Sequence, residues 1–258
     1  MRVTLLQTDI KWGEPSANQI IAEEFLNKNL GSDVYVLPEM WPTGFATNPE
    51  GMAEDEAESL STGSVAWMLR MAKDHNAAIC GSIAIRTEAG KYANRMYFVM
   101  PDGQVTFYDK RHLFSPGGED KRYCAGNERK IVSFRGFRFL LQVCYDLRFP
   151  VWSRCNNDYD AIIYVANWPH SRHSVWETLL IARAIENQCY VVGVNRTGAD
   201  IALKYSGGSM VVNPYGKVAA QCQDGEEALT AELDKERLDR FRESFPALSD
   251  RDRVSIDY

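Results

Sequence analysis

The chain has 258 residues, which is enough for one large domain or for two small ones. Apolar residues make up 45% of it and charged residues 25%, a globular composition that excludes disorder as the main state. The net charge is −6 and no basic block stands out, so neither a nucleic acid nor an anionic membrane is expected as a partner.

The apolar runs and the cysteines indicate in which cellular compartment the protein is expected. The first residues form too short an apolar run for a signal peptide, and no window approaches the roughly 20 apolar residues that a membrane span needs. We therefore expect a soluble, cytoplasmic protein with free thiols. The cysteines form no CxxC pair, so neither a zinc site nor a disulfide scaffold is indicated. They are Cys80, Cys124, Cys144, Cys155, Cys189 and Cys222.

Segments typical of strands and helices alternate along the chain. In the first half, helices are expected across residues 17–25 and 65–72, and strands over 3–8, 33–37, 77–85, 95–100 and 104–108. In the second half, a helix is expected from 174 to 187, and strands over 130–134, 137–143, 159–166, 190–194, 209–212 and 218–221. A last helix carries Leu238, Phe241 and Phe245 on one side, and the polar tail 247–258 is a candidate to dock on a partner subunit.

This order of elements favours a single α/β domain over residues 1–258. The chain contains no linker, low-complexity segment or internal repeat. Hairpins are expected at the turns 101–103 and 135–136, whereas other strands have the spacing of βαβ units. The sheet should therefore be mixed, with helices covering the outer faces.

Chemically reactive side chains follow four of the predicted strands. They are Glu39 after 33–37, Lys110 after 104–108, Cys144 with Tyr145 after 137–143, and Asn167 with Trp168 after 159–166. Ligands in open α/β sheets bind beyond the carboxyl ends of the strands. If these strands are parallel neighbours, their ends share one pocket.

Cys144 is the natural nucleophile of such a pocket. A free thiol with its ordinary pKa of about 8.5 is only a few per cent ionised at pH 7, so it needs a base or a nearby cation. Glu39 is a candidate to take the proton, and the ammonium of Lys110 is a candidate to stabilise the thiolate and a later oxyanion. The backbone N–H of Tyr145 directly follows the nucleophile and is placed to donate to the same oxyanion.

Several alternatives stay open on this pattern alone. A buried cysteine is usually an inert hydrophobic residue, and a glutamate or lysine after a strand is usually a surface charge. His112, His170 or His173 are rival partners for Cys144. His170 and His173 are also two possible ligands of a metal site, but no third ligand lies nearby in the sequence. A thiol-redox pair is disfavoured because Cys155 is too distant in sequence, and a serine hydrolase because no GxSxG occurs.

Six segments together resemble the carbon–nitrogen hydrolase (nitrilase) superfamily along nearly the whole chain. Each is modest alone, but their order makes the match specific, and the second and third are most similar to the omega-amidase subgroup. The segments are Leu37–Met40, Asp109–Phe114, Val143–Pro150, Val165–Pro169, Ala182–Asn187 and Tyr205–Ser209.

The resemblance implies a catalytic triad and a fold. The triad falls on Glu39, Lys110 and Cys144, with a supporting second glutamate for which Glu119 fits best and Glu128 less well. The implied fold is a four-layer αββα sandwich that packs through helices into homodimers. The implied reaction is hydrolysis of a small amide through a cysteine thioester, without a metal or an organic cofactor.

Omega-amidases act on the terminal amide of dicarboxylic acid monoamides such as 2-oxoglutaramate and 2-oxosuccinamate, so the resemblance implies a subsite for a carboxylate. Arg148 and Arg172 are candidates by position, because the guanidinium binds carboxylates bidentately; a structural ion pair with Asp146 is the alternative for the first. Trp168 and Phe45 are candidate pocket walls, with core packing as their alternative. Asn167 is expected to orient its loop. The runner-up function is hydrolysis of N-carbamoyl-amino acids or other small aliphatic amides, and a non-catalytic scaffold is disfavoured by the intact triad.

Overall fold

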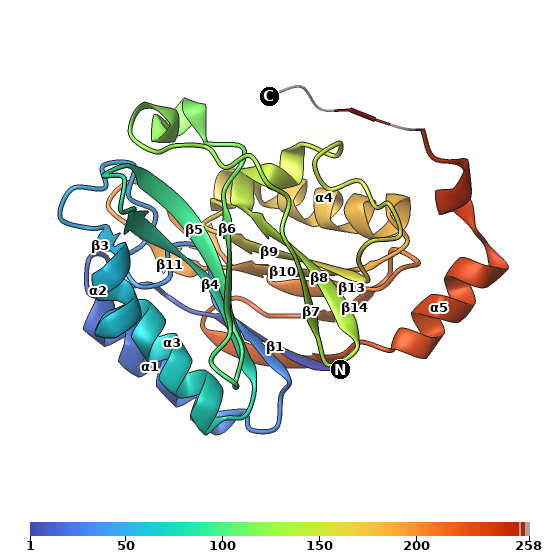
Figure 1. Ribbon diagram of the computed structural model, residues 1–258, viewed down its shortest axis with the longest axis horizontal. Helices are drawn as coiled ribbons and strands as arrows, with labels where there is room; N and C mark the ends of the chain where they lie inside the picture. The colour runs from blue at the N-terminus through green and yellow to red at the C-terminus, as the bar shows by residue number, and fades with distance from the viewer. Residues whose placement is uncertain (253, 256–258) are drawn as a thin grey trace.

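The computed structural model describes residues 1–252 and 254–255, and in it two β-sheets lie face to face (Figure 1). The first sheet has the order β15 (Glu227–Glu232), β1 (Arg2–Gln7), β2 (Val34–Val36), β4 (Ala78–Arg86), β5 (Tyr92–Val99) and β6 (Val105–Asp109), and β3 (Glu54–Asp55) pairs with β4. The second has the order β14 (Val218–Gln221), β13 (Met210–Val212), β10 (Tyr190–Asn195), β9 (Ala161–Ala166), β8 (Phe137–Val143) and β7 (Ile131–Phe134). A separate hairpin joins β11 (Thr197–Ala199) to β12 (Lys204–Ser206).

Both sheets are mixed. β1, β2 and β4 run parallel to one another, as do β8, β9 and β10, whereas the outer strands pair antiparallel. The central strands are rich in apolar residues because both of their faces are covered: β9, for example, is apolar at every position and all six of its residues are buried. The parallel strands also bring their carboxyl ends to a common edge, which is where the reactive residues follow.

Helices cover the outer face of each sheet. α1 (Pro15–Lys28) and α3 (Ser64–Asp74) pack on the first sheet through one buried cluster, and α4 (His173–Glu186) packs on the second through another. The remaining helices are α2 (Glu56–Ser61) and α5 (Lys235–Ser244), and the latter extends away from the sheets (Figure 1). The predicted four-layer αββα sandwich is therefore confirmed.

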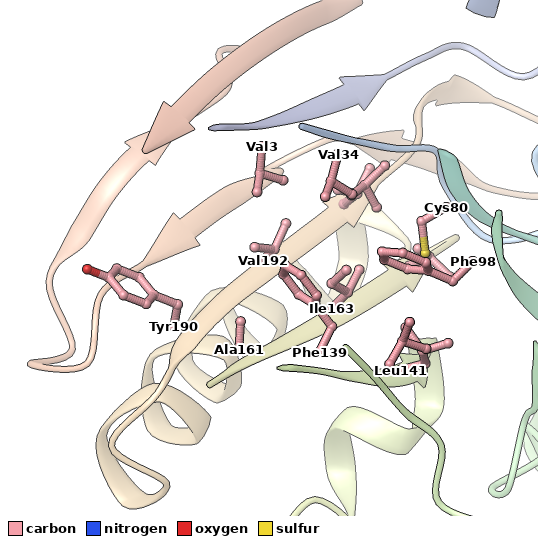
Figure 2. Close-up of a cluster of buried hydrophobic side chains, with 14 of the residues drawn as sticks. Val3, Val34, Cys80, Phe98, Phe139, Leu141, Ala161, Ile163, Tyr190 and Val192 are labelled. Atoms are coloured by element: carbon pink, nitrogen blue, oxygen red, sulfur yellow. The ribbon is translucent and has the colours of Figure 1, made fainter. Parts of the chain in front are cut away.

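The main core lies between the two sheets. Side chains from the first sheet meet side chains from the second in Figure 2, which shows Val3, Val34, Cys80 and Phe98 opposite Phe139, Leu141, Ile163 and Val192. All of these residues are fully buried. Burial of this kind contributes about 25 cal/mol per Å² of apolar surface, so the contact between the sheets stabilises the fold.

The observed elements differ from the predicted ones at several places. β9 begins at residue 161 rather than 159, and the last helix ends at Ser244, so Phe245 lies beyond it and is exposed. β15 was not predicted, because Ala231 is its only buried residue and the strand shows no apolar run. The short elements β3, α2, β11 and β12 were not predicted either. Part of the tail at 247–258 lies outside the described residues, and nothing tests its docking on a partner.

No helix within the described part of the chain has the length and apolar character that crossing a membrane requires.

Candidate active site

The ends of three strands bring Glu39, Lys110 and Cys144 to one place. Glu39 follows β2, Lys110 follows β6, and Cys144 follows β8 directly. The Lys110 Nζ atom lies 2.9 Å from Glu39 Oε1, and both side chains are completely buried. Cys144 and Glu39 line the same cavity. Residues separated by as many as 105 positions in the chain therefore come together because β2 and β8 belong to facing sheets, and not because their strands are parallel neighbours.

Glu119 is the second glutamate at this place. It lies in a short 3₁₀ helix, η2 (Glu119–Lys121), and its side chain is completely buried. Its Oε2 atom accepts from Lys110 Nζ at 2.8 Å and from the backbone N–H of Phe114 at 2.6 Å. Glu128, the weaker candidate, is exposed and pairs with Lys130 at 3.0 Å. The ammonium is therefore flanked by Glu39 and Glu119.

The backbone at Cys144 adopts an unusual conformation. Its φ of +45° lies in the left-handed region, which is costly for a residue with a side chain, at the point where β8 turns into the 3₁₀ helix η3 (Cys144–Arg148). Asp146 holds this turn: its Oδ2 accepts from the Val143 N–H at 3.0 Å and from the Tyr108 hydroxyl at 2.8 Å. The first N–H groups of a helix lack intrahelical acceptors, and Tyr145 is the second residue of η3.

The charges at the site are strongly coupled. Burial raises the pKa of the Cys144 thiol well above its ordinary range, and the carboxylate of Glu39 acts in the same direction while the Lys110 ammonium opposes it. Burial alone would lower the pKa of Lys110, but Glu119 and Glu39 outweigh it and hold that pKa well above its usual range. Burial raises the pKa of Glu119, against the attraction of Lys110. The resting site therefore pairs a neutral thiol with a charged ammonium.

Two asparagines complete the polar contacts. The Asn167 N–H donates to Glu39 Oε2 at 2.8 Å, and its side-chain amide donates to the Glu39 carbonyl, which agrees with its expected role of orienting the loop. Asn94 donates to both glutamates and was missed by the sequence analysis. Its only signal is a polar residue at a fully buried position inside β5, and such a residue is common enough in sheets to pass unnoticed.

The cavity is narrow, with a volume of about 40 Å³, and is mostly apolar. The predicted residues Tyr145, Arg148, Arg172, Trp168 and Phe45 all line it. The full lining consists of Glu39, Phe45, Phe114, Cys144, Tyr145, Arg148, Asn167, Trp168, Pro169, Arg172, Leu203 and Tyr205. A narrow apolar cavity with a few polar groups suits a small linear ligand.

The two arginines face this cavity without a carboxylate partner. The Arg148 guanidinium lies 5.2 Å from the Trp168 ring, and that of Arg172 lies 5.3 Å from the Phe114 ring. Neither forms an ion pair with any residue that the structure describes. The alternative pairing of Arg148 with Asp146 does not occur, because Asp146 is occupied by its contacts around the turn.

Phe45 also belongs to the site. Its ring centre lies 5.2 Å from Lys110 Nζ, within the range of a cation–π contact. It packs at 6.5 Å from Phe114, which lines the same cavity. Core packing alone therefore does not describe its position.

The histidines do not support a Cys–His arrangement. His112 is bound to Asp146 Oδ1 through Nδ1 at 2.8 Å and stacks on Phe149 with ring centres 3.8 Å apart. His173 contacts Ser206 and Glu177, and His170 is exposed. None of them lines the cavity. In the described ranges of the chain, no cluster of three His, Cys, Asp or Glu side chains has an arrangement that would hold a metal ion.

Curated relatives match this chain over nearly its full length. It is 47% identical over 258 residues to omega-amidase YafV of Yersinia enterocolitica, covering 99% of this chain and 98% of the relative. It is 48% identical over 260 residues to omega-amidase YafV of Escherichia coli K12, with the same coverage. It is 37% identical to the 2-oxoglutaramate amidase of Bacillus subtilis, covering 96% of each chain.

Solved structures share the fold. The crystal structure of XC1258 from Xanthomonas campestris is described as a CN-hydrolase superfamily protein with an arsenic adduct in the active site. It superposes with a TM-score of 0.95 at 39% identity and covers 100% of this chain and 99% of that chain. A nitrilase-superfamily amidase from Nesterenkonia AN1 superposes with a TM-score of 0.82 at 22% identity, covering 95% and 96% of the two chains, which shows the fold alone.

A family model described as carbon-nitrogen hydrolase matches residues 2–243. This range contains every residue of the cluster around Lys110 and every residue that lines the cavity. The chain belongs to the carbon–nitrogen hydrolase family.

Proposed function

We propose that this protein hydrolyses the terminal amide of small dicarboxylic acid monoamides, of the 2-oxoglutaramate and 2-oxosuccinamate type, and releases ammonia. The observation that carries the proposal is the buried contact of Glu39 with Lys110 beside Cys144, at a cavity that is also lined by Arg148 and Arg172. The relatives named omega-amidase and 2-oxoglutaramate amidase, at 37–48% identity, support the choice of substrate.

The first half of the reaction forms a thioester. Glu39 takes the thiol proton of Cys144, and the sulfur forms a bond to the amide carbon. The negative charge that develops on the amide oxygen is stabilised by Lys110 and by the N–H of Tyr145. The carbon–nitrogen bond then breaks as Glu39 passes its proton to the nitrogen, so ammonia leaves and the acyl group stays on the sulfur.

The second half hydrolyses the thioester. Glu39 takes a proton from water, whose oxygen attacks the thioester carbon. The carbon–sulfur bond breaks, the proton returns to the Cys144 sulfur, and the free acid departs. Glu119 supports both halves by holding the ammonium of Lys110 at 2.8 Å. Every step uses groups of this chain.

Arg148 and Arg172 are proposed to bind the distal carboxylate of the substrate. Both guanidinium groups border a cavity whose other walls are largely apolar, so a carboxylate entering it would find its counter-charge there. Trp168 and Phe45 would limit the length of the acyl chain. The Trp168 ring is fixed by a hydrogen bond from its Nε1 atom to the Arg172 carbonyl at 2.8 Å.

The assembly is part of the same proposal: residues 1–258 act as one domain, and two copies form a homodimer in the cytoplasm. An exposed apolar strip supports a partner surface. Tyr215 packs on Phe241 with ring centres 4.1 Å apart, and Ile185 and Phe245 are more than half exposed nearby. Light scattering on the purified protein is expected to give twice the mass of one chain, and a monomer would contradict this part.

The function is tested by ammonia release from 2-oxoglutaramate. The parent protein is expected to release ammonia, and Cys144→Ala to release none above background. Cys124→Ala is the matched control, because this thiol is exposed and does not line the cavity. Hydrolysis of N-carbamoyl-β-alanine or another small amide instead would favour the runner-up function. A folded parent protein that hydrolyses none of these substrates would refute the enzyme assignment.

A further inference from the structure

The amide of Asn94 lies between the two buried glutamates. Its Nδ2 atom is 2.8 Å from Glu39 Oε1 and 3.1 Å from Glu119 Oε1. An ionised carboxylate only accepts hydrogen bonds, so the NH₂ group, and not the carbonyl, must face these oxygens. The opposite atom, Asn94 Oδ1, is buried and has no hydrogen-bond partner among the residues that the structure describes.

Asn94 and Lys110 bind the same two oxygen atoms. Lys110 Nζ lies 2.9 Å from Glu39 Oε1 and 3.2 Å from Glu119 Oε1, so the four groups form a closed ring of contacts. The backbone supports this ring, because the Lys110 N–H donates to the Asn94 carbonyl at 2.9 Å in register between β5 and β6. The side chain of Asn94 therefore donates to the two carboxylates, and its backbone carbonyl accepts from the backbone N–H of Lys110.

Simple packing does not explain an asparagine at this position. A buried carbonyl without a partner is unfavourable, and an apolar residue of similar size would avoid that cost. The ring holds two carboxylates but a single cation, and like charges in one buried site resist ionisation. A neutral donor that contacts both carboxylates relieves this repulsion without adding charge.

We propose that Asn94 is a positioning residue, whose amide keeps Glu39 and Glu119 ionised and fixed on either side of Lys110. This inference deepens the proposed function and rests on it, because it assigns to Asn94 the task of keeping the base ready for Cys144.

The charged and titratable groups that face this ring come from several elements. Lys110 follows β6, Cys144 follows β8, Tyr123 follows η2, and Tyr205 lies on β12. Burial raises the pKa of both tyrosines, so they stay neutral near pH 7. Among these groups, the carboxylate of Glu119, whose pKa is raised by burial, is the one that can gain a proton on acidification. Removing a donor from a carboxylate raises its pKa, so the acidic limb of activity should move to higher pH.

The test compares Asn94→Leu with the parent and with Asn187→Leu. The control asparagine is equally buried, but it binds Cys155 and Arg183 beyond the end of α4 and is outside the cavity. In Asn94→Leu we expect kcat to fall about 10- to 100-fold and the acidic limb of kcat/KM to rise by about one pH unit, where one unit is a tenfold change. Asn187→Leu should leave the limb unmoved. Asn94→Ser, which keeps one donor, should give an intermediate shift and serves if the leucine variant does not fold.

A second readout does not depend on turnover. Protein labelled with ¹³C at the glutamate carboxyl groups is titrated by NMR, with Glu39→Gln and Glu119→Gln identifying the two buried signals. Both signals should titrate at higher pH in Asn94→Leu than in the parent. Unchanged titration together with an unmoved acidic limb would overturn the role of Asn94 while the parent's ammonia release keeps the proposed function standing. A parent without amidase activity would instead refute the proposed function, and the titration would still decide whether Asn94 controls the carboxylates.

Discussion

Lys110 is the single cation of the buried cluster, and its ammonium contacts both glutamates. We predict that Lys110→Met lowers kcat by at least about 10²- to 10³-fold, the usual effect of removing one oxyanion donor. It should also lower the free energy of unfolding by about 3–5 kcal/mol, because two buried carboxylates lose their counter-charge. Ammonia release and urea unfolding measure the two effects.

Lys130→Met is the control for this prediction, because Lys130 pairs with the exposed Glu128. Exposed ion pairs contribute only about 0–1 kcal/mol, so this variant should behave like the parent. A Lys110→Met variant with the parent's kcat would remove Lys110 from the mechanism.

A substitution of Arg172 tests whether this residue binds the carboxylate of the substrate. In Arg172→Gln, the KM for 2-oxoglutaramate should rise about 10- to 100-fold, because hydrogen bonds to a charged group contribute about 1.5–3 kcal/mol. The KM for an uncharged small amide should change little. Arg70→Gln, at an exposed position on α3, is the control. An equal rise in KM for charged and uncharged amides would mean that Arg172 does not bind the substrate carboxylate.

The residues of the site were predictable to different degrees. Glu39, Lys110 and Cys144 follow predicted strands, and the edge of a parallel sheet is a known place for ligands, so their types and positions indicated a pocket. Asn94 precedes the predicted strand 95–100, which in the structure begins at Tyr92, so its burial and its contact with two glutamates could not be foreseen. The alternative ion pair of Arg148 with Asp146 does not form, because the Asp146 carboxylate faces the turn. Spacing in the sequence does not reveal that direction.

At the scale of elements, the turn between β8 and η3 sets the position of Cys144, the proposed nucleophile. Asp146 accepts hydrogen bonds from Val143, His112 and Tyr108, so it ties this turn to the loop after β6 that carries Lys110. One side chain therefore fixes both Cys144 and Lys110.

We predict that Asp146→Asn destabilises the protein by about 1–3 kcal/mol and lowers kcat. The introduced NH₂ group would face donors on one side, leaving at least one buried group without an acceptor. Urea unfolding and ammonia release report the change. Asp102→Asn in the exposed turn before β6 is the control, and a destabilisation equal to that of this control would show that the turn does not depend on Asp146.

The strands and helices that were predicted share a clear apolar pattern, and those that were missed lack one. β9 and β10 are completely buried and mostly apolar and were found, whereas β15 is mostly half-buried and was not. The β11–β12 hairpin was also missed, although Leu203 and Tyr205 from its region line the cavity. Its shape follows from contacts with distant residues, such as the hydrogen bond that the Thr197 N–H donates to the Thr8 carbonyl at 3.0 Å, which local pattern does not contain.

At the scale of the whole molecule, the core between the sheets holds the strand ends in place. We predict that Ile163→Ala lowers the free energy of unfolding by about 2–5 kcal/mol, because Ile163 is fully buried between the sheets. Ile20→Ala changes the same side chain at a position on α1 that is 62% exposed, and should change stability by no more than about 0.5 kcal/mol. Equal losses for the two variants in urea unfolding would contradict the assignment of the core.

The arrangement of two facing sheets also means that the candidate site needs both sheets. Glu39 and Lys110 follow strands of the first sheet, and Cys144 follows a strand of the second, so the site exists only when both sheets are packed together. We propose that these groups make Cys144 a nucleophile that carries the acyl group.

Mass spectrometry of the intact protein, quenched with acid during turnover of 2-oxoglutaramate, tests this claim most directly. We predict an added mass equal to the substrate minus ammonia, located by digestion to the peptide that contains Cys144 and missing from Cys144→Ala. An adduct on a different cysteine, or a Cys144→Ala variant that turns over at the parent's rate, would contradict it.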